Sequence, residues 1–429
     1  MRKAKDLLTK LGGNLFDQML SALSNVVLSI LVARSVDAAG FGSFSIAFLI
    51  YGMAFAAMKS LVGQPLQIKF SAAPQDELRE RMSQGAGTTL TVSVVIALGV
   101  ALGVALGGLG AGAATGEALL ALAVWLPSLL VQDYCRMAFF AAGRPWSAAL
   151  IDGIWAVVQF GLLAVLLLNG SHSLTLLIGA WGLGATVSAV VGLLLLRVSL
   201  RVSRTFTWMR EQANLSRYLL AEYILGLGAV QVGILLIALI TSEADVGAIR
   251  AAQVLLGPLG IVATAAFQFT VPEIARRIDW PAKRLQLFAA LVSGGLLLVH
   301  VTYVSALLVM PPEWGTALFG DSWHGAALVL LPMCLSSCFS CMANGPAGVL
   351  YGLGWARETF RINLIKGPLI VVLLLGATWS WGVIGSAWAF AAIEAIILPF
   401  WVFTLIRATK SPRKPETAPQ NDESSSLQN

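Results

Sequence analysis

The first long apolar stretch of the chain carries a row of polar side chains. They recur at spacings of four, three, four and four residues, and they are Asn14, Gln18, Ser21, Asn25 and Ser29, with Asp17 beside them. In an α-helix this spacing places them on one continuous face. A polar face is costly against hydrocarbon, so it lines a water-filled cavity or packs against a polar partner. We favour a cavity, because the sequence offers no equally polar partner helix.

Ionisable side chains form a second group inside the apolar stretches: Lys59, Asp133, Arg136, Asp152, Glu222, Arg250, Lys366 and Glu394. An ion at the centre of a bilayer costs about 2.5–3.5 kcal/mol even on the lenient insertion scale, so each needs a partner or water. Asp152 lies at the same depth as Arg136 on the next predicted helix, so these two can neutralise each other. Lys59 and Lys366 have no acid of matching depth nearby in the sequence. An ammonium group on a flexible stem suits an anionic phosphate group.

The sequence does not favour disulfides, a metal site or a nucleotide-binding loop. All four cysteines lie in apolar segments, and Cys334, Cys338 and Cys341 share one helical face without a histidine nearby. We expect these thiols to pack rather than to bind a metal or to form disulfides. The fragments GLGAV and GVLYGLG lack the strand–loop–helix context and the lysine of a phosphate loop. We therefore expect no catalytic residues, no metal and no cofactor.

The elements that carry these side chains follow from composition. The chain has 429 residues, of which 57% are hydrophobic and 12% are charged, whereas soluble domains are about 25% charged. This excludes a soluble enzyme, a nucleic-acid-binding protein and a disordered protein. The sequence predicts an all-α polytopic membrane protein with twelve helices, at 14–34, 42–63, 86–111, 117–142, 146–169, 174–197, 216–241, 245–270, 285–310, 324–350, 359–380 and 382–406.

The distribution of positive charge predicts the orientation of these helices. With twelve spans, nearly all lysines and arginines outside them fall on the side of the two termini, and the opposite side offers only Arg34. The positive-inside rule then places both termini in the cytoplasm. Asn14, Asp17 and Gln18 open the first span, so we do not expect a cleavable signal peptide. The polar tail within 407–429 is predicted to be disordered.

The two halves of the chain resemble each other at an offset of 205 residues. Asp17 then aligns with Glu222, and Gly42 aligns with Gly247. An ordered series of such matches indicates duplication of a six-helix unit. We predict a basic N-terminus at 1–13, a bundle at 14–197, a cytoplasmic linker at 198–215, a second bundle at 216–406 and the tail at 407–429. Six spans are an even number, so both bundles share one orientation, and a transported molecule would pass between them.

Two segments carry a resemblance to a known family. FDQMLSALSNVVLSILVARSVDAAGFGSFSIAF (16–48), followed by SLVGQPL (60–66), resembles polysaccharide or O-antigen (Wzx-type) flippases. These belong to the multidrug/oligosaccharidyl-lipid/polysaccharide (MOP) exporter superfamily. QDYCRMAFFAAGRPWSAALIDG (132–153) looks like a second family segment. The resemblance implies two pseudo-symmetric six-helix bundles in a V, as in multidrug and toxin extrusion (MATE) transporters, around a central cavity lined by the first and seventh helices.

The resemblance also implies a function and a place in the cell. Such proteins move undecaprenyl-pyrophosphate-linked oligosaccharides across the bacterial inner membrane for O-antigen, lipopolysaccharide or exopolysaccharide synthesis. They work by alternating access coupled to an ion gradient. The expected partners are the lipid-linked oligosaccharide, membrane lipids, and a polysaccharide polymerase with its chain-length machinery, and no nucleic acid. The chain departs from the family in its mixed cavity charges and in lacking two further C-terminal helices.

The family's site is carried over residue by residue. The candidates for binding phosphate or an acidic sugar are Lys59, Arg136, Arg250 and Lys366. The polar residues of the first span, Asn14, Gln18, Ser21 and Asn25, would hydrogen-bond sugar hydroxyls or water. Asp17 and Glu222 are the candidates for coupling to a proton or another cation.

Two alternative functions remain open. A cation-coupled multidrug exporter of the same fold would need an aromatic-lined acidic pocket, whereas the first span is polar and weakly aromatic. A membrane polysaccharide polymerase or ligase would be an enzyme, and it would need a large outer loop with arginine and histidine. The longest outer loop here, at 311–323, is too short to build such a site.

Overall fold

The structure is a computed structural model that describes residues 2–107 and 112–410, without the side chains of residues 2–12, 14, 15, 227 and 356. The predicted tail beyond Lys410 lies outside the described residues. The elements are α1 (Arg2–Ser35), α2 (Ala38–Met58), η1 (Lys59–Gly63), α3 (Gln64–Phe70), α4 (Gln75–Ala105), α5 (Ala113–Ala141), α6 (Pro145–Leu168), α7 (Leu174–Leu196), η2 (Val202–Arg204), α8 (Thr205–Tyr223), η3 (Ile224–Gly228), α9 (Ala229–Ile240), α10 (Glu243–Ala275), α11 (Ala282–Leu308), α12 (Pro312–Phe319), α13 (Ser322–Gly352) and α14 (Ala356–Lys410).

These helices cross the membrane twelve times. Within the described ranges, ten helices are long and apolar enough for a crossing, and α8 with α9 adds another, bent by 52° at η3. The long α14 supplies two crossings, because Trp381 and Gly382 leave the helical conformation. Gly382 has φ +62°, a backbone region that favours glycine. The predicted all-α, twelve-helix fold is confirmed, and the described residues contain no strand.

Several helices extend beyond the predicted spans, among them α1, which begins at Arg2 rather than at residue 14. α4 begins at Gln75 rather than at residue 86, because Asp76 and Glu77 in its first turn suit a helix N-terminus outside the apolar layer. The segment predicted as a linker, 198–215, is helical from Thr205 onward. The short α12 lies in what was predicted as the outer loop at 311–323. Hydropathy locates the apolar layer, so it misses helix that continues beyond it.

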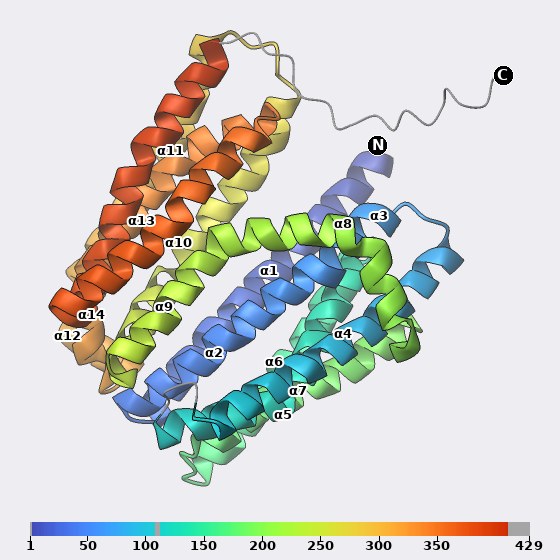
Figure 1. Ribbon diagram of the computed structural model, residues 1–429, viewed down its shortest axis with the longest axis vertical. Coiled ribbons are helices and arrows are strands. Elements are labelled where there is room, and N and C mark those ends of the chain that lie inside the picture. Colours follow the sequence, from blue (N-terminus) through green and yellow to red (C-terminus); the bar gives the residue numbers. More distant parts are fainter. Residues whose placement is uncertain (1, 108–111, 411–429) are drawn as a thin grey trace.

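The helices form two lobes that meet at one end and diverge toward the other (Figure 1). We call α1–α7 the N-lobe and α9–α14 the C-lobe. The lobes diverge at the end where α1 begins and α14 finishes, which we call the open end. At the opposite, closed end, α2 of the N-lobe packs directly against α10 of the C-lobe.

The contact at the closed end depends on two glycines. Gly42 of α2 lies against the carbonyl of Glu243, so a Cβ at position 42 would come within 1.8 Å of that oxygen. Gly247 of α10 faces Gly42 in return, and a Cβ there would lie 3.1 Å from the Gly42 nitrogen. Thr115 of α5 donates a hydrogen bond to the Glu243 carboxylate. The two glycines aligned by the sequence repeat therefore meet where the lobes cross.

An aromatic cluster fixes the interior of the N-lobe. The fully buried Trp181 of α7 packs edge-on against Tyr51 of α2, with ring centroids 4.8 Å apart, and it stacks on Phe48 at 5.6 Å. Such aromatic pairs contribute about 0.5–1.5 kcal/mol each beyond the area that they bury. The Tyr51 hydroxyl donates a hydrogen bond of 2.7 Å to Asp133 of α5. The core thus sets α2 against α5 and holds a carboxylate in place.

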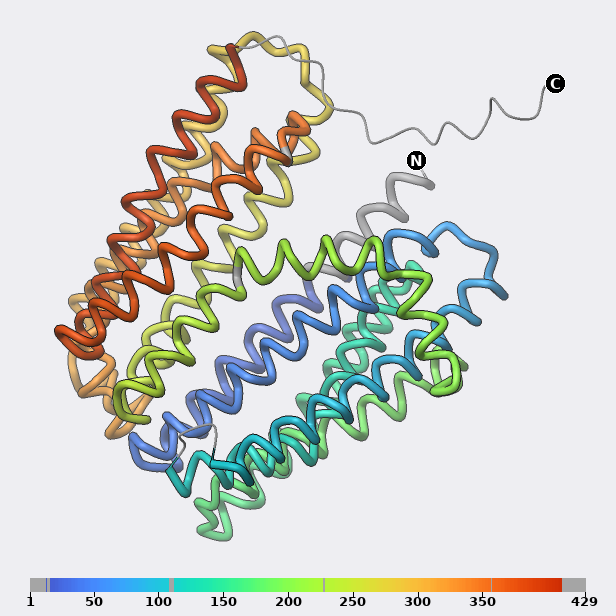
Figure 2. The backbone as a smooth tube through the Cα atoms, in the orientation of Figure 1, coloured from blue at the N-terminus to red at the C-terminus, as the bar shows by residue number. Residues whose placement is uncertain are grey.

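The seventh crossing joins the two lobes. Its first part, α8, packs on α4 and η1 of the N-lobe, and its second part, α9, packs on α14 of the C-lobe. Figure 2 shows this segment passing from one lobe to the other. The Leu61 carbonyl lies in the π-helix η1, where it can accept hydrogen bonds from other helices. It accepts them from Ser216 Oγ at 3.2 Å and from Trp208 Nε1 at 3.4 Å. Arg81 adds an ion pair to Glu211 at 2.6 Å.

Candidate functional site

A cavity of about 570 Å³ lies between the lobes. The N-lobe contributes Gln18, Ser21, Ala22, Asn25, Phe55, Lys59, Gln67, Asp133, Arg136, Met137 and Phe140, and the C-lobe contributes Thr264 and Gln268 of α10. A cavity of this volume lies within the range for binding sites of small molecules. Because both lobes line it, a relative movement of the lobes would change its shape and its access.

The polar face of α1 borders this cavity. Gln18, Ser21 and Asn25 line it, and the next polar residue of the row, Ser29, lies closer to the closed end. The Ser29 hydroxyl donates to the Asn25 carbonyl at 2.8 Å and accepts a hydrogen bond of 3.4 Å from Arg250 of the C-lobe. The side chain of Asn14 lies outside the described residues. The row therefore leads from the cavity to a cation on the facing lobe.

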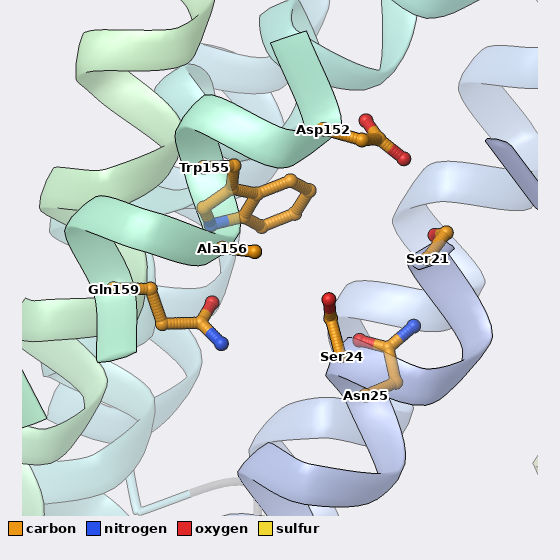
Figure 3. A pocket seen from close by; sticks show the side chains of 7 residues that line it. All are labelled: Ser21, Ser24, Asn25, Asp152, Trp155, Ala156 and Gln159. Carbon is orange, nitrogen blue, oxygen red and sulfur yellow. The ribbon is translucent and has the colours of Figure 1, made fainter. Parts of the chain in front are cut away.

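A second, smaller pocket lies behind α1, inside the N-lobe. Figure 3 shows the side chains that line it, which come from α1 (Ser21, Ser24 and Asn25) and from α6 (Asp152, Trp155, Ala156 and Gln159). Its volume of about 10 Å³ is close to that of a single water. α6 is thus a polar partner of α1, which the sequence did not reveal. The α1 face both lines a cavity and packs against polar side chains.

Arg136 lies at the centre of a buried cluster of three carboxylates. Its guanidinium is 3.2 Å from Asp17 of α1, 3.5 Å from Asp152 of α6 and 3.7 Å from Asp133 on its own helix. These three acids are at most 4% exposed. Gln132 donates a hydrogen bond of 2.8 Å to Asp152. The expected pairing of Arg136 with Asp152 is present, and two further carboxylates join it.

The charges in this cluster do not balance. Three ionised carboxylates around one guanidinium leave two negative charges without a partner. Neither oxygen of Asp17 and only one oxygen of Asp152 has a hydrogen-bond partner within the described residues. Uncompensated buried charge is expensive, so the cluster is suited to taking up protons or a small cation when water leaves. The described residues contain no group of three or more His, Cys, Asp or Glu arranged to hold a metal ion.

Lys59 and Arg250 are cations without a carboxylate partner in the described part of the chain. Lys59 is exposed on η1 and lines the large cavity. Arg250 of α10 lies over the ring of Phe48, 4.1 Å from its centroid, and lines a pocket of about 210 Å³ between α2, α9 and α10. Its Nε has no hydrogen-bond partner among the described residues. Both cations are therefore available to an anionic ligand between the lobes.

Lys366 does not belong to this site. Its Nζ lies 2.6 Å from Glu394, and the two residues stand on the two halves of α14. The prediction that Lys366 has no acid of matching depth nearby in the sequence is wrong, because Glu394 meets it from the following crossing. Neither side chain lines the cavities described above. We find a neutralised ion pair here rather than a free cation.

The repeat-related acids Asp17 and Glu222 have different surroundings. Asp17 is fully buried beside Arg136, whereas Glu222 is exposed near the end of α8. The sequence symmetry therefore does not extend to the environment of these two carboxylates.

Several residues of the site were not predicted from the sequence. Thr264 and Gln268 supply the C-lobe wall of the cavity, and Gln67 lies on the N-lobe wall, where its amide donates to the Met137 carbonyl at 3.2 Å. Gln268 is a polar residue within an apolar run, so the signal that identified the α1 row was also available here. Tyr51 and Gln132 hold carboxylates of the cluster, and only the folded contacts reveal that role.

Comparison with known proteins identifies the fold. No family model and no curated protein sequence matches the chain. A solved structure of the lipid II flippase MurJ in an inward closed conformation is similar, with TM-score 0.70, 12% identity, and coverage of 91% of this chain and 86% of that chain. An inward-facing multidrug resistance MATE family transporter of the MOP superfamily is also similar, with TM-score 0.67 and 13% identity. The similar region covers 91% of this chain and 95% of that transporter's chain.

An outward-facing structure of a MATE family transporter is less similar, with TM-score 0.54, 12% identity, and coverage of 95% of this chain and 96% of that chain. The chain therefore has the fold of MOP superfamily transporters, and it is a multi-pass membrane protein. At this level of identity, the structural similarity shows the fold and does not identify the substrate.

Proposed function

We propose that this protein carries a lipid-linked oligosaccharide across the bacterial inner membrane for the synthesis of a surface polysaccharide. The substrate would be an undecaprenyl-pyrophosphate-linked glycan, moved from the cytoplasmic to the outer leaflet. The observation that carries the proposal is the inter-lobe cavity, whose wall combines amides, hydroxyls and the unpaired Lys59. The fold, which the chain shares with a lipid II flippase, supports it.

The two parts of such a substrate would meet different groups. Sugar hydroxyls both donate and accept hydrogen bonds, as do the amides of Gln18, Asn25 and Gln268. The diphosphate would bind Lys59 or Arg250, which lack carboxylate partners in the described residues. Arg136 would act within its carboxylate cluster rather than as a free phosphate ligand. Asn14 remains a candidate for a sugar contact at the start of the row.

The orientation of the chain supports loading from the cytoplasm. The start of α1 and the end of α14 stand at the open end, and the positive-inside rule favours a cytoplasmic location for this end. The closed end, with Gly42 against Glu243, would then face outward. The higher TM-score with an inward-facing than with an outward-facing MATE structure agrees with this orientation.

Transport would proceed by alternating access of the two bundles, 14–197 and 216–406. The buried carboxylates around Arg136 would couple it to an ion gradient, since uptake of a proton or cation changes the charge of the N-lobe next to the cavity. Asp17 is the proposed coupling residue, and Glu222 is a second candidate on the bridging α8. The flipped glycan would pass to a polysaccharide polymerase and its chain-length machinery.

A cation-coupled multidrug exporter is the second candidate. The observation that favours it is the acidic cluster beside the cavity, together with Phe55 and Phe140 on the cavity wall. Such a wall can bind an aromatic cation. The shared fold with MATE transporters supports this candidate as well.

Leaflet-resolved analysis of undecaprenyl-linked glycans separates the two functions. Deletion of the gene is expected to trap labelled intermediates on the cytoplasmic leaflet and to abolish the surface polymer. Complementation with Arg250→Gln should fail, whereas Arg276→Gln, which changes an arginine outside the cavity that is 76% exposed, should restore the polymer. Normal crossing with new drug sensitivity would favour the exporter. Crossing with single repeat units left outside would favour a polymerase.

A further inference from the structure

We infer that the oligosaccharide carried by this protein is uncharged, and that the cavity selects against sugar acids. The inference rests on the proposed function and specifies its substrate class. It follows from the charges that face the cavity, from their partners, and from the number of cations that remain for an anionic ligand.

The most central cation of the cavity wall is already neutralised. Arg136 lines the cavity, yet Asp17, Asp152 and Asp133 lie within 3.7 Å of its guanidinium. Even if two of the three acids were protonated, the remaining carboxylate would match its charge. If they were ionised, the N-lobe wall would be net negative. In neither state does Arg136 leave a positive potential for a sugar carboxylate.

One of these acids faces the cavity itself. Asp133 lines it, held by Tyr51 from behind at 2.7 Å. A uronic or sialic acid entering the cavity would be brought toward this carboxylate. Juxtaposed like charges cost several kcal/mol at interfaces and are a common device for rejecting wrong partners. The cavity wall therefore carries a repulsive element against acidic sugars.

The largest group of residues on the cavity wall is polar and uncharged. Gln18, Asn25, Gln67 and Gln268 contribute amides, and Ser21 and Thr264 contribute hydroxyls. Amides and hydroxyls offer donors and acceptors side by side, which matches sugar hydroxyl and acetamido groups. Neutral hexoses and N-acetylhexosamines thus find partners over much of this surface.

The negative charge of the lipid diphosphate matches the positive charge of the two cations that lack a carboxylate partner in the described residues. Within the described residues, Lys59 and Arg250 are the cations that line the inter-lobe cavities without a carboxylate partner. The proposed substrate brings a diphosphate in every case, and this group carries at least two negative charges. The charges of these two cations are then balanced by the diphosphate, and the described lining residues leave no excess positive charge for a carboxylate on the glycan. A net acidic glycan would have to leave water without a counter-charge, which is costly.

The test compares two substrates in proteoliposomes that contain the full chain. One probe is a fluorescent undecaprenyl-pyrophosphate trisaccharide of neutral hexose and N-acetylhexosamine, and the other ends in a hexuronic acid. Leaflet position is read by quenching with an impermeant reductant. We expect the neutral probe to move at least about tenfold faster, which corresponds to ~1.4 kcal/mol in the barrier. Equal rates, or a faster acidic probe, would overturn the inference.

A cation added to the cavity wall should relax this selectivity. Gln268 is exposed on α10 and lines the cavity, so Gln268→Lys places an ammonium there without disturbing the buried cluster. It should reduce the preference for the neutral probe to about threefold or less, a change of ~0.7 kcal/mol. Gln75→Lys, at the exposed start of α4, is the matched control and should leave the preference unchanged. An unchanged preference in Gln268→Lys would contradict the electrostatic account.

Failure of the proposed function would look different. If neither probe moves while a fluorescent cationic drug is transported by the same proteoliposomes, the flippase proposal and this inference both fail. If both probes move equally, the flippase proposal stands and the inference alone fails.

Discussion

The two lobes treat ionisable side chains within the membrane in different ways. The N-lobe gathers Asp17, Asp133, Asp152 and Arg136 into one cluster beside the cavity. The C-lobe pairs Lys366 with Glu394 at 2.6 Å, away from the cavities. One lobe holds a surplus of acid, and the other holds a balanced pair.

This difference indicates that the two lobes have different roles. A balanced pair needs no proton or ion from outside, so it serves packing between two crossings. An unbalanced cluster changes its charge with its surroundings, and it lies where two lobes and the substrate would meet. Transport is therefore expected to be sensitive to charge changes in the N-lobe cluster and tolerant of a neutral replacement of the Lys366–Glu394 pair in the C-lobe.

The largest expected effect is that of removing Arg136. Arg136→Leu leaves three buried carboxylates without a cation, and breaking a buried pair in this way costs about 3–5 kcal/mol. We expect a lower unfolding temperature in detergent and loss of transport, with partial rescue by Arg136→Lys. An unchanged unfolding temperature in Arg136→Leu would show that the cluster is not held by this cation.

The next largest effect is expected from substitution of the glycines at the closed end. The space around Gly42 in the N-lobe is smaller than the space around Gly247 in the C-lobe. A Cβ at Gly42 would lie 1.8 Å from the Glu243 carbonyl, whereas a Cβ at Gly247 would meet nothing nearer than 3.1 Å. Gly42→Ala should therefore destabilise the contact between the lobes by about 1–3 kcal/mol and open this end. Labelling of a cysteine introduced near Thr115 should increase more in Gly42→Ala than in Gly247→Ala. The reverse order would contradict the lobe contact described here.

A smaller effect is expected for the C-lobe pair. Lys366→Met leaves Glu394 without its partner and should destabilise the protein by about 0.5–3 kcal/mol. Replacement of both residues, Lys366→Met with Glu394→Leu, should recover most of that stability and keep transport. Thermal unfolding of the single and double variants checks this. A stable double variant that no longer transports would show that the C-lobe pair has a functional role.

The smallest effect is expected at the exposed member of the repeat-related acids. Glu222→Gln should change the transport rate by no more than about twofold, since surface substitutions stay within ~0.5 kcal/mol. Asp17→Asn should abolish the response of transport to an imposed proton or sodium gradient. Measurement of both variants in the same proteoliposomes checks the contrast. An equal loss in both would mean that α1 and the bridging α8 share the coupling.

The sequence was sufficient for the crossings, because apolar runs of the right length directly report the membrane. It also predicted the Arg136–Asp152 pair, since these residues lie at one depth on consecutive helices. It did not predict that Asp17 joins them, because α1 and α5 are far apart in the chain. The Lys366–Glu394 pair was not predicted although its partners stand on successive crossings, because their relative depth depends on where Trp381 and Gly382 break the helix.

The bend of the seventh crossing was also not predicted. The run at 216–241 is apolar enough to read as one straight helix. The bend follows from η3 and from the contacts of α8 with the Leu61 carbonyl, and these are tertiary contacts. Hydropathy reports burial in lipid and carries no information on which lobe a helix packs against.

The most direct test of the division between the lobes is the initial rate at which proteoliposomes translocate a neutral undecaprenyl-pyrophosphate glycan. It compares Lys59→Ala, which removes a free cation from the cavity, with the double variant Lys366→Met and Glu394→Leu. We expect the rate to fall by at least about tenfold in Lys59→Ala and to stay within about threefold in the double variant. A normal rate in Lys59→Ala together with a lost rate in the double variant would contradict it.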